Sequence, residues 1–390
     1  MIKRRLEVCY TALQAIYYAS CAFMCGYGSY ILVSIGYDSA TVGIILSSAC
    51  LLSFVVNPFI ANLSDRSKKY NIFTIGNIIA WVSFFLCIYA SFQSIVSIKT
   101  TISFILLRAS VSVIEPFINS IPGKLEENGV EIKFGVGRSI GSLSYAIFST
   151  IAGFLTEIYP YQIVYVLNIA AYIIAILTYF FLKRSYNALP EAIEREKEET
   201  ITYSEFVKRH SIFIALCVAL VGIYVGYVMV DNLMILIIDN VNGTESEMGL
   251  ILGIKALVEI PIIFFYDKLE KRFSNEVLLK VAAFGFAIKS LLMYLAKSTT
   301  LMFVAQVFQP FGLALMVPSF VSFINRIMDK KEAVRGQSLF VMAQILSTII
   351  ATLCGGKIAS AYSVSAMLLF AFTVNIISSI AFCLLLKKCK

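Results

Sequence analysis

Charged residues are scarce in this chain. Asp, Glu, Lys and Arg make up 14% of its 390 residues, whereas about 25% is typical of soluble globular domains. Hydrophobic residues make up 59%, and the mean hydropathy is +0.84. These values exclude a water-soluble enzyme and a disordered protein. The net charge of +8 does not indicate a nucleic-acid binder, because the Lys and Arg residues form short clusters between apolar runs.

The chain also has few residues of the kind that form metal sites or catalytic triads. The only histidine is His210, which argues against a histidine-based metal site and against a Ser-His-Asp triad. The nine cysteines lie mostly in apolar runs, where a thiol behaves as a small hydrophobic side chain. No G-x-x-x-x-G-K-[ST] segment occurs, which argues against ATP as the energy source. We therefore expect no enzymatic activity, no cofactor, no metal and no nucleic-acid partner.

Long apolar segments fill most of the chain instead. A helix needs about 20 apolar residues to cross a hydrocarbon core of about 30 Å, and runs this continuous favour helices over barrel strands. The segments that predict a span are 8–37, 39–64, 70–98, 100–123, 139–156, 158–182, 210–230, 248–266, 276–296, 298–325, 336–356 and 358–386. The sequence thus predicts an all-α membrane protein with twelve transmembrane helices.

The basic residues predict the orientation of these spans. With the N-terminus on the cytoplasmic side, most of the 32 Lys and Arg fall in cytoplasmic segments, and only Lys99 and Lys297 fall in segments on the other side. This asymmetry follows the positive-inside rule. We expect both termini to be cytoplasmic. The compact chain without long tails favours a monomer in a bacterial inner membrane.

The chain also divides into two halves that echo each other. The polar segment 183–209 separates residues 1–182 from residues 210–390 and is expected to be a cytoplasmic linker. Pro58 precedes a charged loop in the first half, and Pro261 precedes a charged loop about 200 residues later. Two pseudo-symmetric six-helix bundles are typical of transporters whose site lies near the middle of the membrane.

Several segments resemble the major facilitator superfamily, and this likeness covers the whole chain. Residues 63–69 (LSDRSKK) resemble its acidic-basic loop, although Ala61 stands where Gly is frequent. Residues 114–118 (IEPFI) and 134–145 resemble motifs of the oligosaccharide:proton symporters, the branch of lactose permease. That closer resemblance is confined to about 114–146. Residues 256–261 and 335–339 resemble the phenylpropionate permease branch.

Charged side chains within the predicted spans, or directly at their ends, are the main candidate functional residues. Each costs about 2.5–3.5 kcal/mol at a helix centre, so a retained charge is a functional-site hypothesis. Lys357 is one turn from the end of its span and is expected to be an interfacial anchor. The candidates are Arg108, Glu115, Arg138, Asp231, Lys255, Glu259 and Lys289.

The first-half candidates predict a substrate site. Arg108 and Glu115 are seven residues apart and share a helix face at a separation of about 10 Å. The resemblance implies that Glu115 and Arg138 hold the substrate, and that Tyr145, which replaces the family's Trp, stacks on it. A guanidinium and a carboxylate can together bind adjacent hydroxyl groups. The alternatives are a structural ion pair and an ordinary packing aromatic.

The second-half candidates predict proton coupling. A buried carboxylate whose cationic partner can be exchanged meets the requirement for a proton carrier. Glu259 is the first candidate, with Lys255 one turn away or Lys289 as its alternating partner. Asp231 is the second candidate. The alternative is a permanently paired charge cluster that stabilises this half.

The tenth span departs from the symporter branch, whose members carry Lys, His and Glu there at i, i+3 and i+6. This chain has Gln306, Gln309 and Gly312 at the matching positions. Either the proton site has moved to the span of Glu259, or coupling uses other groups. Gln309, together with Lys289 at the family's Arg position, is a candidate substrate ligand. Hydrogen bonding between helices is the alternative for the glutamines.

The resemblance also implies that Asp65 and Arg66 gate the cytoplasmic side, and plain topological charge is the alternative. Together these observations predict a transporter that works by alternating access and is driven by the proton gradient. Its partners would be a proton, the lipid bilayer and a small polar organic solute, either a sugar, a glycoside or an organic acid. An efflux antiporter for drugs or metabolites is the second hypothesis, and a non-transporting membrane sensor is the third.

Overall fold

The part of the chain that the structure describes is helical and contains no strand. The computed structural model describes residues 2–66, 71–189, 206, 207 and 209–389, except for the side chains of residues 65, 66, 330 and 331. Among these residues, twelve helical segments are long and apolar enough to cross a membrane. The predicted all-α, twelve-span architecture is therefore confirmed.

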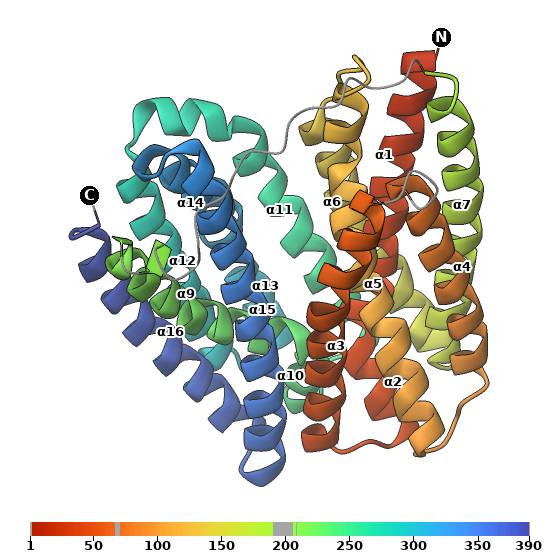
Figure 1. The fold of residues 1–390 in the computed structure, drawn as a ribbon. Coiled ribbons are helices and arrows are strands. Elements are labelled where there is room, and N and C mark those ends of the chain that lie inside the picture. The colour runs from red at the N-terminus through yellow and green to blue at the C-terminus, as the bar shows by residue number, and fades with distance from the viewer. Residues whose placement is uncertain (1, 67–70, 190–205, 208, 390) are drawn as a thin grey trace. The chain divides into compact units, whose positions relative to one another are not determined.

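The helices follow the predicted spans in order (Figure 1). In the first half they are α1 (Ile2–Cys21), η1 (Ala22–Gly26), α2 (Gly28–Ile35), α3 (Ser39–Arg66), α4 (Ile72–Ser91), α5 (Ile98–Glu126), α6 (Phe134–Ile158) and α7 (Gln162–Tyr186). In the second half they are α9 (Ser211–Asn232), α10 (Met234–Asn240), α11 (Glu245–Arg272), α12 (Asn275–Leu295), α13 (Thr299–Gln306), η2 (Pro310–Ala314), α14 (Leu315–Ile327), α15 (Lys330–Ala361) and α16 (Val364–Leu386).

Several helices extend beyond their apolar runs. The apolar run of the sixth span ends at residue 182, whereas α7 continues to Tyr186, and α15 begins at Lys330, six residues before its apolar run. The start of α15 is set by Asp329, whose side chain accepts a hydrogen bond from the Glu332 backbone N–H. Helix ends follow capping chemistry rather than hydropathy, because the first backbone N–H groups need an acceptor. The same N-cap contact is made by Asn71, Ser97, Ser274, Ser298 and Ser363.

Contacts divide the chain into two compact units. Unit 1 comprises Met1–Arg195 and Thr244–Leu257, and unit 2 comprises Glu196–Gly243 and Val258–Lys390. In unit 1, α1 packs against α5, α6 and α7, while α4 packs against α5 and α7. In unit 2, α9 packs against α12, α15 and α16, and α12 also contacts α13, η2 and α14. The linker predicted at 183–209 stays a prediction, because most of it lies outside the described residues.

Glycines allow the first half of α11 to pack on α6 within unit 1. A Cβ atom at Gly153 would lie 2.7 Å from the Glu245 carbonyl oxygen and 2.9 Å from the Cα of Gly249. A Cβ atom at Gly253 would lie 3.0 Å from the Ala146 carbonyl oxygen. Small residues four apart allow the backbones of membrane helices to approach closely. This contact explains why residues 244–257 group with unit 1.

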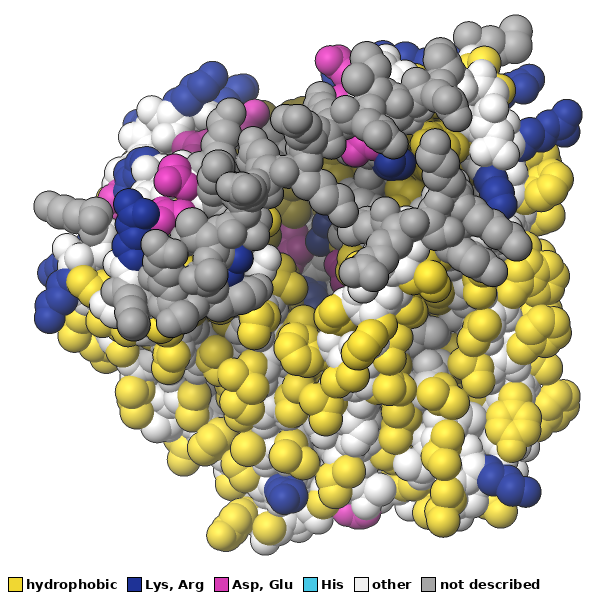
Figure 2. Space-filling model, in the orientation of Figure 1, with side chains coloured by type: hydrophobic (Ala, Val, Ile, Leu, Met, Phe, Trp, Pro, Cys, Tyr) yellow, Lys and Arg dark blue, Asp and Glu magenta, His cyan; other side chains and the backbone are white. Residues whose placement is uncertain are grey.

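The surface of each unit is apolar over most of the helix length. Figure 2 shows hydrophobic side chains along the middle and lower parts of the helices, whereas Lys and Arg side chains gather mainly at the upper end. Strongly exposed aromatic side chains include Phe59 and Phe264, with exposed fractions of 71% and 73%. A soluble monomer does not expose an apolar surface of this extent. The chain is therefore an integral, multi-pass membrane protein.

Candidate functional site

Two predicted spans are interrupted among the described residues, and a third is followed directly by a break. The first span changes from α1 into the π-helical turn η1, and the helix of the seventh span, α9, ends one residue after Asp231, before α10. The tenth changes from α13 into the π-helical turn η2 next to Gln309. Pro310 lacks a backbone N–H, and π-helical turns occur mostly at functional positions. Interrupted helices are typical of transporter binding sites.

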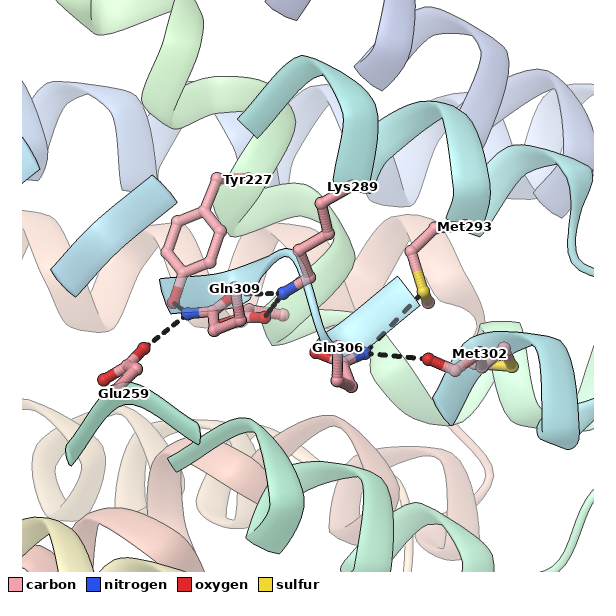
Figure 3. A network of polar contacts seen from close by, with 8 residues as sticks. Tyr227, Glu259, Lys289, Met293, Met302, Gln306 and Gln309 are labelled. Carbon is pink, nitrogen blue, oxygen red and sulfur yellow. Dashed lines mark hydrogen bonds and ion pairs between the residues drawn. The ribbon is translucent and has the colours of Figure 1, made fainter. Parts of the chain in front are cut away.

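A continuous chain of polar contacts crosses unit 2 (Figure 3). The Lys289 ammonium lies 3.6 Å from an Asp231 carboxylate oxygen and donates a hydrogen bond to the Gln309 carbonyl oxygen at 2.5 Å. The Gln309 NH₂ group donates to Glu259 Oε1 at 2.5 Å and to the Tyr227 hydroxyl at 3.3 Å. Helices α9, α11 and α12 and the interrupted tenth span each contribute to this chain. We call Asp231, Lys289, Gln309 and Glu259 the relay residues.

Glu259, Lys289 and Gln309 are buried and Asp231 is partly buried, and an amide suits the central position of the relay. The exposed fractions are 8% for Glu259, 3% for Lys289 and 1% for Gln309. An amide presents an acceptor to a cation and a donor to an anion at the same time. Gln309 therefore joins Glu259 to Lys289, and Asp231 forms the ion pair with Lys289. The predicted exchange of Lys289 onto Glu259 stays a prediction.

The side chain of Gln306 contacts other residues than that of Gln309. It is fully buried, and its NH₂ group donates to the Met293 sulfur at 3.8 Å and to the Met302 carbonyl at 3.4 Å. Figure 3 shows it turned toward these two methionines. Only one of the two glutamines singled out in the sequence is thus placed among the relay residues.

In unit 1, Arg138 lies in the second turn of α6. Its guanidinium donates to the Ser142 hydroxyl at 3.0 Å and lies 4.3 Å from the centre of the Tyr18 ring. A Cβ atom at Gly141 would overlap the Tyr18 ring, so the absence of a side chain there allows the close approach of α1. Gly141 thus allows the Tyr18 ring to lie against the Arg138 guanidinium in cation–π geometry.

Tyr145 lies two turns further along α6. The Lys255 ammonium is 5.8 Å from the centre of its ring, and its hydroxyl approaches Gly26 of η1. Lys255 belongs to the part of α11 that groups with unit 1, and Glu259 belongs to unit 2. The pairing of Lys255 with Glu259 and the stacking of Tyr145 on a substrate stay predictions.

Arg108 and Glu115 share one face of α5, and both are partly buried. The Arg108 guanidinium donates to the Ser112 hydroxyl at 3.0 Å, whereas its Nε is buried and has no hydrogen-bond partner among the described residues. The ionisable groups close to Glu115 include Tyr17 and Cys21 of α1. The proposed pairing of Glu115 with Arg138 stays a prediction. The side chains of Asp65 and Arg66 lie outside the described residues, so their gating role also stays a prediction.

The structure shows one ionic cluster that the sequence did not predict. Glu332, in the first turn of α15, is only 3% exposed and accepts hydrogen bonds from Arg209 at 2.7 Å and from His210 at 3.1 Å. A signal was present, because Asp329 and Glu332 have the spacing of a capping box. This cluster fixes the start of α9 to the start of α15 within unit 2.

Comparison with family models decides the family. The model of the MFS_1 like family matches residues 5–372. The chain belongs to this family. A comparison with curated proteins gives no match.

Three solved structures with the same fold are described as transporters. A mutant of the nucleoside transporter NupG has a TM-score of 0.79 at 11% identity, covering 97% of this chain and 99% of that one. A bacterial homologue of the human lysosomal transporter Spinster has a TM-score of 0.71 at 13% identity, covering 100% and 98%. A peptide transporter of the POT family has a TM-score of 0.75 at 10% identity, covering 99% and 97%. At these identities the likeness shows the fold alone.

The family and the fold together establish a membrane transporter of the major facilitator type, not an enzyme. The resemblance to the superfamily is thereby confirmed. The lactose permease and phenylpropionate permease branches stay predictions.

Proposed function

We propose that this transporter is a proton-coupled symporter of a small polar organic solute. It works by alternating access in a bacterial plasma membrane, as a monomer with both termini in the cytoplasm. The relay residues of unit 2 carry this proposal, because they bury two acids and one base in a membrane-spanning bundle. The proton gradient is the energy source, and no other cofactor takes part.

The charges of the relay residues favour a single proton site. Asp231 balances Lys289 at 3.6 Å, whereas Glu259 is hydrogen-bonded to the neutral amide of Gln309. An ionised carboxylate is costly at a position as buried as that of Glu259, and binding of one proton removes its charge from a medium of low dielectric. Glu259 is therefore the proton carrier, and Asp231 and Lys289 form the permanent pair.

The substrate class follows from unit 1. Arg108, Glu115, Arg138 and Tyr145 offer guanidinium donors, carboxylate acceptors and an aromatic face, which suit a polar solute with hydroxyl groups. The structural relatives are named as transporters of nucleosides and peptides, so the fold accommodates small polar organic molecules. Lys289 and Gln309 of unit 2 are further candidate substrate ligands.

The test is uptake into proteoliposomes that contain the purified protein. Labelled sugars, nucleosides and organic acids are offered with an acidic exterior and, separately, without a pH gradient. We expect the gradient to stimulate uptake of the cargo. Glu259→Gln should abolish that stimulation but retain exchange of internal for external cargo, because exchange needs no net proton movement. Lys357→Gln, at an exposed interfacial position, is the matched control.

Two results would contradict the proposal. One is uptake by the wild type that ignores the pH gradient, and the other is Glu259→Gln uptake that still responds to it. Stimulation only when the interior is acidic would identify the efflux antiporter instead.

A further inference from the structure

A groove lies on the surface of unit 2, between α12 and the interrupted tenth span. Its volume is about 470 Å³, which is within the range of about 300–1,000 Å³ of sites for small organic ligands. Its apolar walls include Val281 and Ile288 of α12 and Phe308 and Phe311 of the tenth span. Lys280 is the only charged side chain among the described residues that line it. The groove therefore combines a long apolar wall with a single cation.

The groove is formed where the backbones of α12 and η2 approach closely. A Cβ atom at Gly285 would lie 2.5 Å from the Phe311 carbonyl oxygen, so the two segments meet there without an intervening side chain. The Phe311 ring stays on the outer side and is 42% exposed. Gln309, two residues before it, is 1% exposed and belongs to the relay residues. The groove and the relay thus lie on different faces of the same interrupted span.

The length of the groove matches one leaflet of a bilayer. Its lining on α12 extends from Val277 to Ile288, which corresponds to about 17 Å along the helix. One leaflet contributes half of a hydrocarbon core of about 30 Å. Val277 is in the first turn of α12, and Ile288 is near the middle of that helix. An acyl chain that follows this groove therefore extends from the end of α12 to the middle of the membrane.

Lys280 is a partly buried cation at the headgroup end of this groove. Its ammonium forms no hydrogen bond or ion pair with any residue that the structure describes. Glu276, one turn earlier on α12, is paired with Arg326 of α14 instead. Lys387, just after the end of α16, acts electrostatically on the same Cys383 thiol as Lys280, so a second cation lies at this end. A lysine side chain at this depth can extend its ammonium to the level of the lipid headgroups.

We propose that this groove is a binding site for one anionic phospholipid, with an acyl chain along its apolar wall and the phosphate hydrogen-bonded to Lys280. All acyl chains are as apolar as the groove, so contact with the chain does not distinguish one lipid from another. The charge of the headgroup does, because each lysine near an anionic headgroup strengthens binding about fivefold. Basic pockets between membrane helices bind anionic headgroups in the same way. The inference does not depend on the proposed symport.

The experiment uses the full-length protein, purified and delipidated in dodecyl maltoside micelles. Dioleoylphosphatidylglycerol is the anionic probe, and dioleoylphosphatidylcholine has the same chains with a zwitterionic headgroup. Glycerol phosphate offers the phosphate without chains, and dioleoylglycerol offers the chains without phosphate. Native mass spectrometry measures the bound lipid, and thermal unfolding measures its effect on stability. We expect one phosphatidylglycerol to bind at least fivefold more tightly than phosphatidylcholine and to raise the melting temperature, whereas glycerol phosphate and dioleoylglycerol should do neither.

Two pairs of variants test the assigned groove. Lys280→Gln should weaken phosphatidylglycerol binding about fivefold and leave phosphatidylcholine binding unchanged. Lys271→Gln is its matched control, because it removes an exposed cation near the end of α11, outside the groove. Val281→Trp fills the groove and should reduce the binding of both lipids. Val304→Trp is its control, because Val304 is 51% exposed on α13 but does not line the groove.

Equal binding of the two phospholipids by the wild type would overturn the inference, and this measurement needs no variant. Equal losses in Lys280→Gln and Lys271→Gln would also overturn it, because they would indicate a diffuse effect of surface charge. Binding of glycerol phosphate as tight as that of phosphatidylglycerol would exclude a role for the apolar wall. None of these results depends on whether uptake responds to a pH gradient.

Discussion

The strongest test of the relay is the removal of its central amide. Gln309→Leu keeps the approximate volume and deletes the hydrogen bonds to Lys289 and Glu259. A hydrogen bond to a charged group contributes about 1.5–3 kcal/mol in soluble proteins, and polar contacts between membrane helices contribute about 0.6–1.7 kcal/mol. The loss of two such bonds should therefore cost about 2–4 kcal/mol. Lys289 keeps its ion pair with Asp231, so unit 2 should still fold.

Gln306→Leu is the matched control, because Gln306 is equally buried and lies on the same span. Its contacts are a thioether sulfur at 3.8 Å and a backbone carbonyl at 3.4 Å, both long and neutral. We expect a cost below about 1 kcal/mol. Thermal unfolding of the detergent-solubilised variants should rank them, with Gln309→Leu melting several degrees below Gln306→Leu. Equal melting temperatures, or the reverse order, would refute the bridging role of Gln309.

Three further predictions concern other parts of the structure. Gly153→Ala should lower the melting temperature, because its Cβ would lie 2.7 Å from a backbone oxygen. Gly123→Ala should not lower it, because a Cβ at Gly123 would have no atom within 4 Å. Equal effects of the two substitutions would contradict the close helix contact. Asp38 accepts hydrogen bonds from the Thr41 hydroxyl and from backbone N–H groups, which lower the pKa of its carboxyl below 3.8. The difference in stability between the wild type and Asp38→Asn is measured by thermal unfolding across pH. It should have its largest value above pH 3.8 and should shrink as the pH falls through the lowered pKa of Asp38. A difference that does not change with pH would argue against this contribution. Glu332→Gln should increase trypsin cleavage near the start of α9, because its two basic partners lose a charged acceptor, and unchanged cleavage would show that the cluster does not hold that segment.

Hydropathy predicted the spans because apolar length is a local property. The candidate residues of unit 2 were also found locally, since Asp231, Glu259, Lys289 and Gln309 are each polar within an apolar run. Their partners were not predictable, because pairing depends on how side chains from different helices meet. The break after Asn232 and the turn beside Gln309 determine those directions, and neither follows from a hydrophobic pattern.

Glu332 shows why a topological interpretation misses a buried group. The sequence places it four residues before an apolar run, in a segment expected to be an ordinary cytoplasmic loop. The helix nevertheless begins at Lys330, because Asp329 caps it, and the first turn carries Glu332 into contact with Arg209. Hydropathy describes the preference of each residue for lipid or water. It does not indicate whether the residue is buried by other parts of the protein.

The π-helical turn η2 has a consequence for how the chain tolerates insertions and deletions. Each helical residue advances the chain by about 100°, so the loss of one residue between 310 and 314 would rotate everything that follows by that angle. Phe320, which is fully buried and packs against Phe213 of α9 and Phe340 of α15, would then turn away from both rings. The length of this short segment is thus fixed by the packing of an aromatic ring about two turns downstream.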